Sequence, residues 1–314
     1  MSNRRVLFAV RDPANVLPSS LAKAIQVARG LGASLELYHV LTDTLIVDLS
    51  RYEHDVADSL RDRVENEARA PLERMCATAR KHGVTAECTV EWNYPPHEAI
   101  VRRAAETCAE LIVADRHKGA RAFFITQTDF ELLRMCPVPV LLLRSTKPYR
   151  RPKLLAAVDP SHAHAKTAKL DSYILSAAER LANGLRGSLH VAHANHPSIV
   201  GLNVDAAAKR AATQWTVPTL AELQEQGRQA FEEFLADVEV PRKRTHLLEG
   251  NPVKAIPKLA KELKAGIVVM GAVSRSGLER VFIGNTAERV LNSLPCDVLV
   301  VRAANGDRSI YRRS

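Results

Sequence analysis

The sequence predicts an α/β protein made of two copies of a doubly wound parallel sheet. Short runs of Val, Leu, Ile and Ala alternate with segments whose apolar residues repeat at helical spacing. Continuously apolar strands of this kind are typical of a parallel sheet that is covered on both faces. The pattern restarts near the middle of the chain, which indicates an internal duplication. A length of 314 residues is enough for two domains of ordinary size.

The elements of the first copy follow one another in regular alternation. An apolar strand over Val6–Val10 precedes an amphipathic helix over Ser19–Leu31, which Gly30 and Gly32 end. Further strands are predicted over Ser34–Leu41, Val84–Trp92, Leu111–Ala114 and Val138–Leu143, and further helices over residues 51–82, Pro95–Glu110 and Asp129–Met135. The polar, basic and proline-bearing segment Ser145–Pro152 then predicts a linker.

The second copy repeats the first in order. The equivalent segments are Val6–Val10 and Leu154–Val158, Ser34–His39 and Ser188–His193, Pro96–Asp115 and Pro252–Gly271, and the final strands that follow Cys136 and Leu294. The third pair aligns without a gap. We therefore predict one domain over residues 1–146 and a second over residues 153–306.

Composition excludes some classes of protein. The net charge of +9 lies mainly in the second half, and it is typical either of phosphate-bearing partners or of a solvated basic surface. No nucleic-acid motif accompanies it, so a nucleic-acid partner is not expected. No apolar run approaches the roughly 20 residues that span a bilayer. The five cysteines form no CxxC pair, which favours reduced thiols in a cytoplasmic protein.

Ligands of doubly wound sheets bind at the carboxyl ends of the strands. The residues predicted at those ends are Asp12, His39 and Asp115 in the first copy, and Asp159, His193 and Gly271 in the second. The two histidines favour hydrogen-bonded side chains of the crevice over catalytic bases. The sequence contains no G-x-S-x-G, GxxxxGK[ST] or HExxH motif, so we expect no enzyme activity and no catalytic residues.

A glycine-bearing loop follows Gly271 in the second copy. It contains Ser274 and Gly277, and Gly284, Asn285 and Thr286 then open an amphipathic helix. The order strand, loop, helix N-terminus makes a cradle for phosphate, because unpaired backbone N–H groups and the positive end of the helix dipole point at the loop. The alternative is that the glycines only permit turns and that Thr286 only caps the helix.

The spacing Gly271-x-x-Ser274, nine residues, Gly284-Asn285-Thr286 resembles the G-x-x-G-x9-G-[S/T] motif of the universal stress protein family. The duplication, and the segments TDFELLRMCPVPV from Thr128 and GNTAERVLNSLPCDVLV from Gly284, resemble its tandem-domain members. The resemblance implies two flavodoxin-like (adenine nucleotide alpha hydrolase-like) domains, each with a five-stranded parallel sheet. It also implies a cytoplasmic stress-response protein without a known catalytic cycle, in which the last strands of the two copies pair.

In ATP-binding members of the family, adenine lies near the residue matching Asp159 and phosphates lie at the glycine loop. The resemblance therefore implies ATP or a related adenine nucleotide in the second domain. The binding residues that we predict are Asp159, His193, Gly271, Ser274, Gly277, Gly284, Asn285 and Thr286. Ser274 and Asn285 depart from the motif, so ATP binding depends on these two residues.

The first copy departs further from the motif. Asp115, Lys118, Thr126 and Gln127 stand at the positions of Gly271, Ser274, Gly284 and Asn285. An aspartate directed at the phosphate position repels a nucleotide, so we expect no ATP site there, and an Asp115–Lys118 pair instead.

Two weaker candidates complete the set. Asp159, His162 and His164 share a loop that suggests a metal, but without a further ligand element we favour solvent-facing histidines and predict no metal site. The Ala-rich insert Val200–Thr219 favours a contact between domains over a hydrophobic ligand.

These observations leave three functions open. The first is a non-catalytic stress protein that binds a small anionic ligand and whose two domains form an intramolecular pseudo-dimer, with or without a further homodimer. The second is an interaction or scaffold protein whose crevices bind no nucleotide. The third is an enzyme that activates a substrate with ATP, against which the absence of SGGxDS-like and HIGH-like loops argues.

Overall fold

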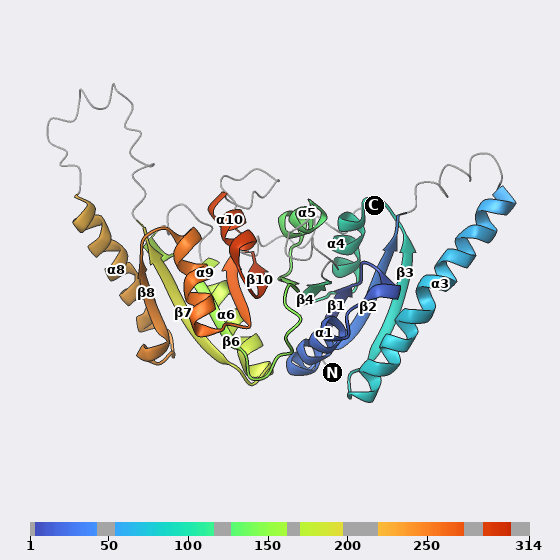
Figure 1. Cartoon of the computed structure of the whole chain (residues 1–314), viewed down its shortest axis with the longest axis horizontal. Helices are drawn as coiled ribbons and strands as arrows, with labels where there is room; N and C mark the ends of the chain where they lie inside the picture. Colours follow the sequence, from blue (N-terminus) through green and yellow to red (C-terminus); the bar gives the residue numbers. More distant parts are fainter. Residues whose placement is uncertain are drawn as a thin grey trace, which may run out of the picture.

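The computed structural model describes residues 4–42, 54–115, 127–161, 170–196, 219–272 and 285–302. Within these ranges the chain forms one ten-stranded sheet with helices on both faces (Figure 1). The two halves of the sequence occupy the two halves of that sheet, which agrees with the predicted duplication.

The first half contributes five strands that all run parallel. They are β1 (Arg5–Ala9), β2 (Ser34–Leu41), β3 (Ala86–Trp92), β4 (Leu111–Ala114) and β5 (Val140–Leu142). Their order in the sheet is β3-β2-β1-β4-β5. The order reverses between β1 and β4, which is the switch point where a doubly wound sheet opens a crevice.

The second half repeats this arrangement. Its strands are β6 (Lys153–Val158), β7 (Ser188–Asn195), β8 (Thr245–Glu249), β9 (Ile267–Gly271) and β10 (Asp297–Val301). They are parallel in the order β8-β7-β6-β9-β10, so the predicted five-stranded, doubly wound sheet is confirmed in both copies.

The two half-sheets join through their last strands. β10 pairs with β5 in antiparallel fashion, with Leu299 opposite Leu141. This pairing across the duplication, which the family resemblance implied, is confirmed. It makes one continuous sheet whose outer edges are β3 and β8.

Helices cover both faces of the sheet, and successive strand residues point to opposite faces. Val6 and Phe8 pack in one apolar cluster, whereas Leu7 and Ala9 pack in the other. The first face carries α1 (Pro18–Leu31), α3 (His54–Lys81), α6 (Leu170–Gly184) and α8 (Leu220–Ala236); the second carries α4 (Pro96–Glu106), α5 (Gln127–Met135), α9 (Pro252–Leu263) and α10 (Asn285–Ser293).

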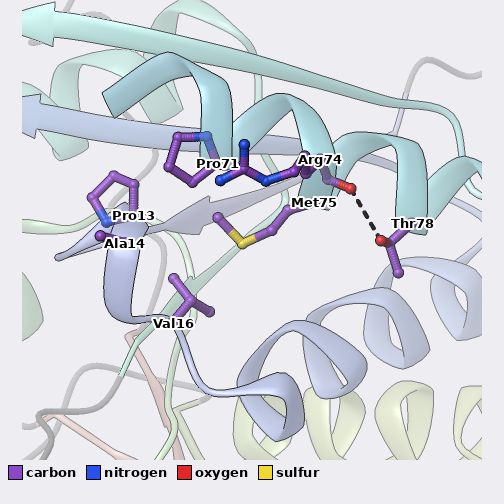
Figure 2. A pocket seen from close by; sticks show the side chains of 7 residues that line it. All are labelled: Pro13, Ala14, Val16, Pro71, Arg74, Met75 and Thr78. Carbon is purple, nitrogen blue, oxygen red and sulfur yellow. Dashed lines mark hydrogen bonds between the residues drawn. The ribbon is translucent and has the colours of Figure 1, made fainter. Parts of the chain in front are cut away.

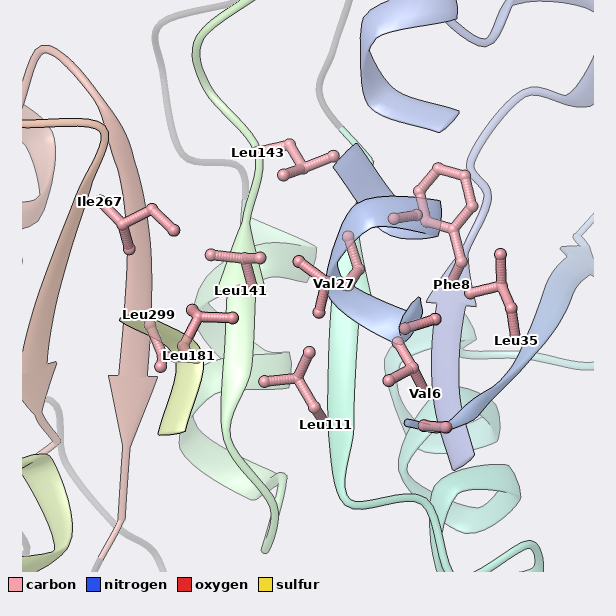
Figure 3. Close-up of a cluster of buried hydrophobic side chains, with 14 of the residues drawn as sticks. Val6, Phe8, Val27, Leu35, Leu111, Leu141, Leu143, Leu181, Ile267 and Leu299 are labelled. Carbon is pink, nitrogen blue, oxygen red and sulfur yellow. The ribbon is translucent and has the colours of Figure 1, made fainter. Parts of the chain in front are cut away.

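The cluster on the first face is continuous across both halves of the molecule. Figure 3 shows Val27 and Leu141 from the first half near Leu181 and Leu299 from the second. Full burial of each such side chain contributes about 1.5–3 kcal/mol, so this shared cluster holds the two domains in one unit.

Helices α1 and α6 cross near the middle of the molecule with their backbones in contact. A Cβ atom at Gly30 would lie 2.6 Å from the carbonyl oxygen of Gly184, and a Cβ atom at Gly184 would lie 2.7 Å from that of Gly30. The two residues occupy equivalent positions in the two copies. Glycine is therefore required at both positions by helix packing.

A buried charged cluster joins the linker to both domains. Lys23 on α1 pairs with Asp297 on β10, and both side chains are almost fully buried. Asp297 also accepts hydrogen bonds from the backbone N–H groups of Arg144 and Ser145 at 2.8 and 2.7 Å, and from the Tyr149 hydroxyl at 2.7 Å. Burial and the adjacent Asp297 raise the pKa of Tyr149 well above its ordinary value, so its phenol remains a donor.

Candidate functional site

The predicted crevice of the second copy lies where β6, β7 and β9 end. Val158 at the end of β6 is in register with His193 on β7, and Ala157 is in register with Met270 on β9. Asp159 directly follows Val158, and Gly271 directly follows Met270. The parallel strands therefore bring Asp159, His193 and Gly271 to one edge of the sheet, as the sequence predicts.

His193 is fully buried, and its ring is held from several sides. Nδ1 lies 3.3 Å from the Val158 carbonyl oxygen and 3.7 Å from Asp159 Oδ1. Nε2 lies 3.5 Å from the Ser161 hydroxyl, and the ring of Phe231 packs against the imidazole with centroids 5.6 Å apart. A proton on Nδ1 satisfies the Val158 carbonyl. The ring thus fixes the turn that carries Asp159.

Asp159 presents a partly exposed carboxylate. Its side chain is 41% exposed, and Oδ1 accepts a hydrogen bond from Ser161 Oγ at 3.0 Å. Its backbone N–H donates to Asp171 Oδ1, at the start of α6, at 3.0 Å. The residue is thus anchored through its backbone while its carboxylate stays partly exposed, so a hydroxyl or amino group of a ligand can reach it.

Gly271, the last residue of β9, faces a helix. A Cβ atom there would lie 2.8 Å from Leu170 Cδ2 and 3.1 Å from Ile174 Cδ1, both on α6. The sequence analysis placed this glycine among the predicted binding residues. The described residues give it a packing reason, because α6 fills the space that a side chain would need.

The structure describes the residues on either side of the glycine loop, Ala272 and Asn285, but not the loop between them. Ser274, Gly277 and Gly284 lie outside the described residues, as do His162, His164, Lys118, Thr126 and most of the insert Val200–Thr219. Asn285 is the first residue of α10, and Thr286 is exposed in its first turn. The N-terminus of α10 therefore follows the loop that leaves β9, as the predicted phosphate cradle requires.

The crevice of the first copy has a similar histidine. His39 Nδ1 lies 2.8 Å from the Val10 carbonyl oxygen, which matches the contact of His193 with Val158. Burial lowers the pKa of His39, and the Val10 carbonyl and Asp12 offset part of that effect. Asp12 accepts a hydrogen bond from the backbone N–H of Ala14 at 3.1 Å and caps a short 3-10 helix, η1 (Pro13–Asn15).

The first crevice differs from the second in its charged side chains. Arg11 is inserted between Val10 and Asp12, whereas Asp159 directly follows Val158. The Arg11 guanidinium donates to Asp129 Oδ1 at 2.7 Å, and Asp129 lies in the first turn of α5. Buried Asp115 stands where the second copy has Gly271. A carboxylate of the protein therefore already lies at the helix N-terminus that would hold a phosphate.

The model of the universal stress protein family matches residues 2–144 and 152–302. The chain belongs to the universal stress protein family. The two matches correspond to the two half-sheets, so the tandem-domain organisation that the sequence predicted is confirmed.

Relatives of this universal stress protein align along almost its whole length. Universal stress protein E of Photorhabdus laumondii is 26% identical over 304 residues, which cover 96% of each chain. Universal stress protein E of Escherichia coli K12 is 26% identical over 305 residues, which cover 94% of this chain and 93% of the relative. The predicted resemblance to tandem-domain members is therefore confirmed across both domains.

Solved structures agree with the fold. A chain described as a universal stress protein from Pseudomonas aeruginosa UCBPP-PA14 superposes with a TM-score of 0.70, at 26% identity, over 96% of this chain and 94% of its own. A universal stress protein from Archaeoglobus fulgidus superposes with a TM-score of 0.58 at 16% identity, over 96% of this chain and 99% of its own. The second likeness concerns the fold alone.

Two further features of this universal stress protein bear on the predictions. No helix in the described ranges is long and apolar enough to cross a membrane. Among the same residues, no group of three or more His, Cys, Asp or Glu side chains is placed to hold a metal ion. The predicted loop histidines lie outside those ranges, so the prediction about them stays a prediction.

Sequence reasoning missed three side chains of the second crevice: Ser161, Asp171 and Phe231. Ser161 lies two residues after Asp159, so its proximity was available from the sequence. Asp171 and Phe231 come from α6 and α8, and nothing in their local sequence distinguishes them from other helix residues. Their roles depend on tertiary packing.

A separate groove of about 340 Å³ lies in the first domain, between η1 and α3 (Figure 2). It is lined by Pro13, Ala14, Val16, Pro71, Arg74, Met75 and Thr78. The dashed line in Figure 2 marks the hydrogen bond that Thr78 Oγ1 donates to the Arg74 carbonyl at 3.0 Å, within α3. The groove lies in the first domain, whereas the family motif lies in the second, so the groove is distinct from the predicted binding site.

Proposed function

We propose that the second domain binds an adenine nucleotide or a related small anionic ligand and that the protein acts in the stress response, in the cytoplasm, without catalysing a reaction on that ligand. One observation carries this proposal. Asp115 stands in the first crevice where the second has Gly271, and the carboxylate of Asp129 lies in the first turn of α5 where α10 has Ala287.

Electrostatics explains why this difference favours binding in the second domain. The N-terminus of a helix carries about half a positive charge and unpaired N–H groups, which attract an anion. In α5 the carboxylate of Asp129, paired with Arg11 at 2.7 Å, already occupies the first turn, whereas the equivalent Ala287 in α10 supplies no carboxylate. The acidic residue in the first turn of α10, Glu288, pairs with Arg134 at 3.2 Å.

The side chains of the second crevice suit binding better than proton transfer. His193 is fully buried and its nitrogens lie against Val158 and Ser161, so it orients the Asp159 turn. Asp159 remains partly exposed and suits a ribose hydroxyl or a base amino group. We therefore expect no turnover of ATP above the background of a variant that cannot bind it.

Titration calorimetry with ATP, ADP and AMP tests the proposal, with Ala287→Asp as the decisive variant. This substitution gives α10 the carboxylate that α5 has, and we expect it to weaken binding at least tenfold through repulsion of the phosphates. The matched control is Asp129→Ala in the first domain, which should leave the affinity unchanged. Equal affinity in wild type and Ala287→Asp would contradict binding at this helix.

The second candidate is an interaction or scaffold protein that binds no nucleotide. The packing of Gly271 against α6 favours it, because the glycine then needs no ligand to explain it. Absence of heat, together with an unchanged melting temperature at millimolar nucleotide, would support this candidate against the first. Gel filtration of the purified chain would determine whether it also forms a homodimer.

A further inference from the structure

The amino-terminal edge of the second half-sheet carries a group of basic side chains. Lys153, the first residue of β6, lies beside the starts of β7 and β9. The Ser188 N–H donates to the Pro152 carbonyl at 3.0 Å, and the Gly266 N–H donates to the Lys153 carbonyl at 2.9 Å. The 3-10 helix η4 (Arg242–Arg244) directly precedes β8 and lies against β7. These strand starts are at the opposite edge of the sheet from the predicted crevice.

We call the cations at these strand starts the basic edge: Arg151, Lys153, Arg186, Arg242–Arg244 and Lys264. All of them are exposed, except Arg244, which is half-buried. None of them forms an ion pair with a residue in the described ranges. The segment that leads into η4 contributes two carboxylates, Asp237 and Glu239, which are fewer than the cations, so the edge keeps a net positive charge.

The first domain neutralises the same place with acidic residues. Arg5, the first residue of β1, pairs with Glu36 at 2.7 Å and with Glu87. In the second domain the first residue of β6 is again a cation, but the strand register places His190 and Arg244 at the positions of those two carboxylates. Burial lowers the pKa of His190, so its imidazole is neutral at pH 7. The positive charge of this edge is therefore particular to the second domain.

One cation of the basic edge occupies a backbone conformation that favours glycine. Arg186 follows α6 with φ +52°, and the equivalent residue after α1 is Gly32, with φ +64°. A residue with a side chain loses stability in this left-handed region, whereas glycine does not. Ending the helix therefore does not explain an arginine at this position. Strain of this kind is retained where a side chain has another use.

We propose that the basic edge binds linear inorganic polyphosphate. Neighbouring strands start about 4.8 Å apart, so cations at successive strand starts can contact several phosphates of one extended chain. Bases of a nucleic acid need aromatic side chains to stack on. The exposed aromatic residues in the described ranges, Tyr94 and Tyr173, lie in the first domain and in the first turn of α6, away from this edge. A polyanion made of phosphate alone therefore fits the edge better than RNA.

The site lies at the other end of the strands from Asp159 and α10, so the proposal does not rest on nucleotide binding in the crevice. Titration calorimetry of the full-length chain with linear polyphosphate of defined length tests it. We expect the logarithm of the binding constant to fall linearly with the logarithm of the salt concentration, because each contact between a cation and a phosphate releases a counterion.

The double variant Arg186→Gly, Lys264→Gly separates binding from stability. Lys264 also has a positive φ, of +53°, so glycine suits both positions. We expect polyphosphate to bind at least tenfold more weakly, with a shallower dependence on salt, while the melting temperature stays equal or rises. A lower melting temperature with unchanged affinity would show that the two cations only stabilise the ends of α6 and α9, and would overturn the proposal.

Matched variants and ligands locate the site. Lys254→Ala removes an exposed cation at the other end of α9 and should leave the affinity unchanged. Ala287→Asp, which alters the helix of the crevice, should leave it unchanged as well. A loss of polyphosphate binding in Ala287→Asp would place the ligand in the crevice and overturn the proposal. Tighter binding of single-stranded RNA with the same number of phosphates, or of polyglutamate with the same charge, would overturn the choice of ligand.

Discussion

The two crevices have the same backbone and different charges. In the second, Asp159 directly follows the first strand of the domain and Gly271 ends β9, whereas in the first Arg11 precedes Asp12 and Asp115 stands in place of Gly271. His39 and His193 keep the same contact with the strand beside them. The comparison teaches that one arrangement of strands can carry different charged side chains at the strand ends.

Strands β2 and β7, which are equivalent in the two domains, also differ in the charge of one buried side chain. In the first domain, buried Glu36 accepts hydrogen bonds from Arg5 at 2.7 Å, from Arg103 at 2.8 Å and from Thr89 at 2.9 Å. In the second, the equivalent of Glu36 is His190, whose Nδ1 lies 3.0 Å from Nε2 of His246 with the rings stacked. An ion cluster and a neutral imidazole pair thus occupy the same place in the fold.

The largest effect is expected at the junction of the two copies, where the ion pair is present on one side only. Asp297→Ala leaves Lys23 buried without its charged partner and removes an acceptor from Tyr149, and we expect it to lower the free energy of unfolding by about 3–5 kcal/mol. Urea denaturation measures this. The double variant Lys23→Met, Asp297→Ala should recover much of the loss, and equal instability of the two variants would show that the charge is not responsible.

A smaller effect is expected where the two copies are alike, at the crossing of α1 and α6. Gly30→Ala forces a methyl group against the Gly184 backbone and should cost about 1–3 kcal/mol, measured by thermal and urea denaturation. Arg29→Ala, exposed on the same helix, serves as the control and should change the stability by less than about 0.5 kcal/mol. Unchanged stability of Gly30→Ala would mean that the helices can separate without loss.

The smallest effect concerns the imidazole pair and depends on pH. Burial, together with His246, Lys153 and Arg244, lowers the pKa of His190 from 6.5 to about 4, and burial lowers that of His246. Between about pH 4 and pH 6.5 the unfolded chain therefore binds more protons than the folded chain. This contribution to the free energy of unfolding is present above pH 6.5 and is lost as the pH falls toward 4. Because solvent screens part of the charge, we expect about 1 kcal/mol.

The variant His246→Thr sharpens this comparison, because it gives the second domain the residue that the first has at Thr89. It removes one of the two imidazoles that must stay neutral, so the loss of stability on acidification should be smaller than in wild type. Melting temperatures recorded from about pH 7 to 4.5 measure the slope. An identical slope in both proteins would assign the acid sensitivity to other groups.

Much of the fold followed from the sequence because each strand is a continuous apolar run. Val6–Val10 and Leu111–Ala114 were predicted within one residue of β1 and β4. The helix predicted over Pro95–Glu110 ends earlier, at Glu106, where Thr107 adopts a non-helical conformation. The predicted C-terminal end of this helix was wrong, because alanines after Arg103 continue a helical pattern beyond the last helical residue.

The candidate site was only partly accessible to the same reasoning. Asp159, His193 and Gly271 were predicted from the strand ends, and the parallel register brings them together. The ion pair between Arg11 and Asp129 was not predicted, because its members are 118 residues apart and neither belongs to a motif. The packing of Gly271 against Leu170 was inaccessible for the same reason.

The antiparallel junction of β5 with β10 has a consequence for symmetry. In a homodimer built around a two-fold axis, each substitution appears on both sides of the interface. Here the two sides are separate stretches of one chain, so Lys23 and Asp297 form an ion pair on one side while the equivalent residues, Ala177 and Pro139, carry no charge. Fusion of the two halves keeps them at high effective concentration and allows each half to change alone.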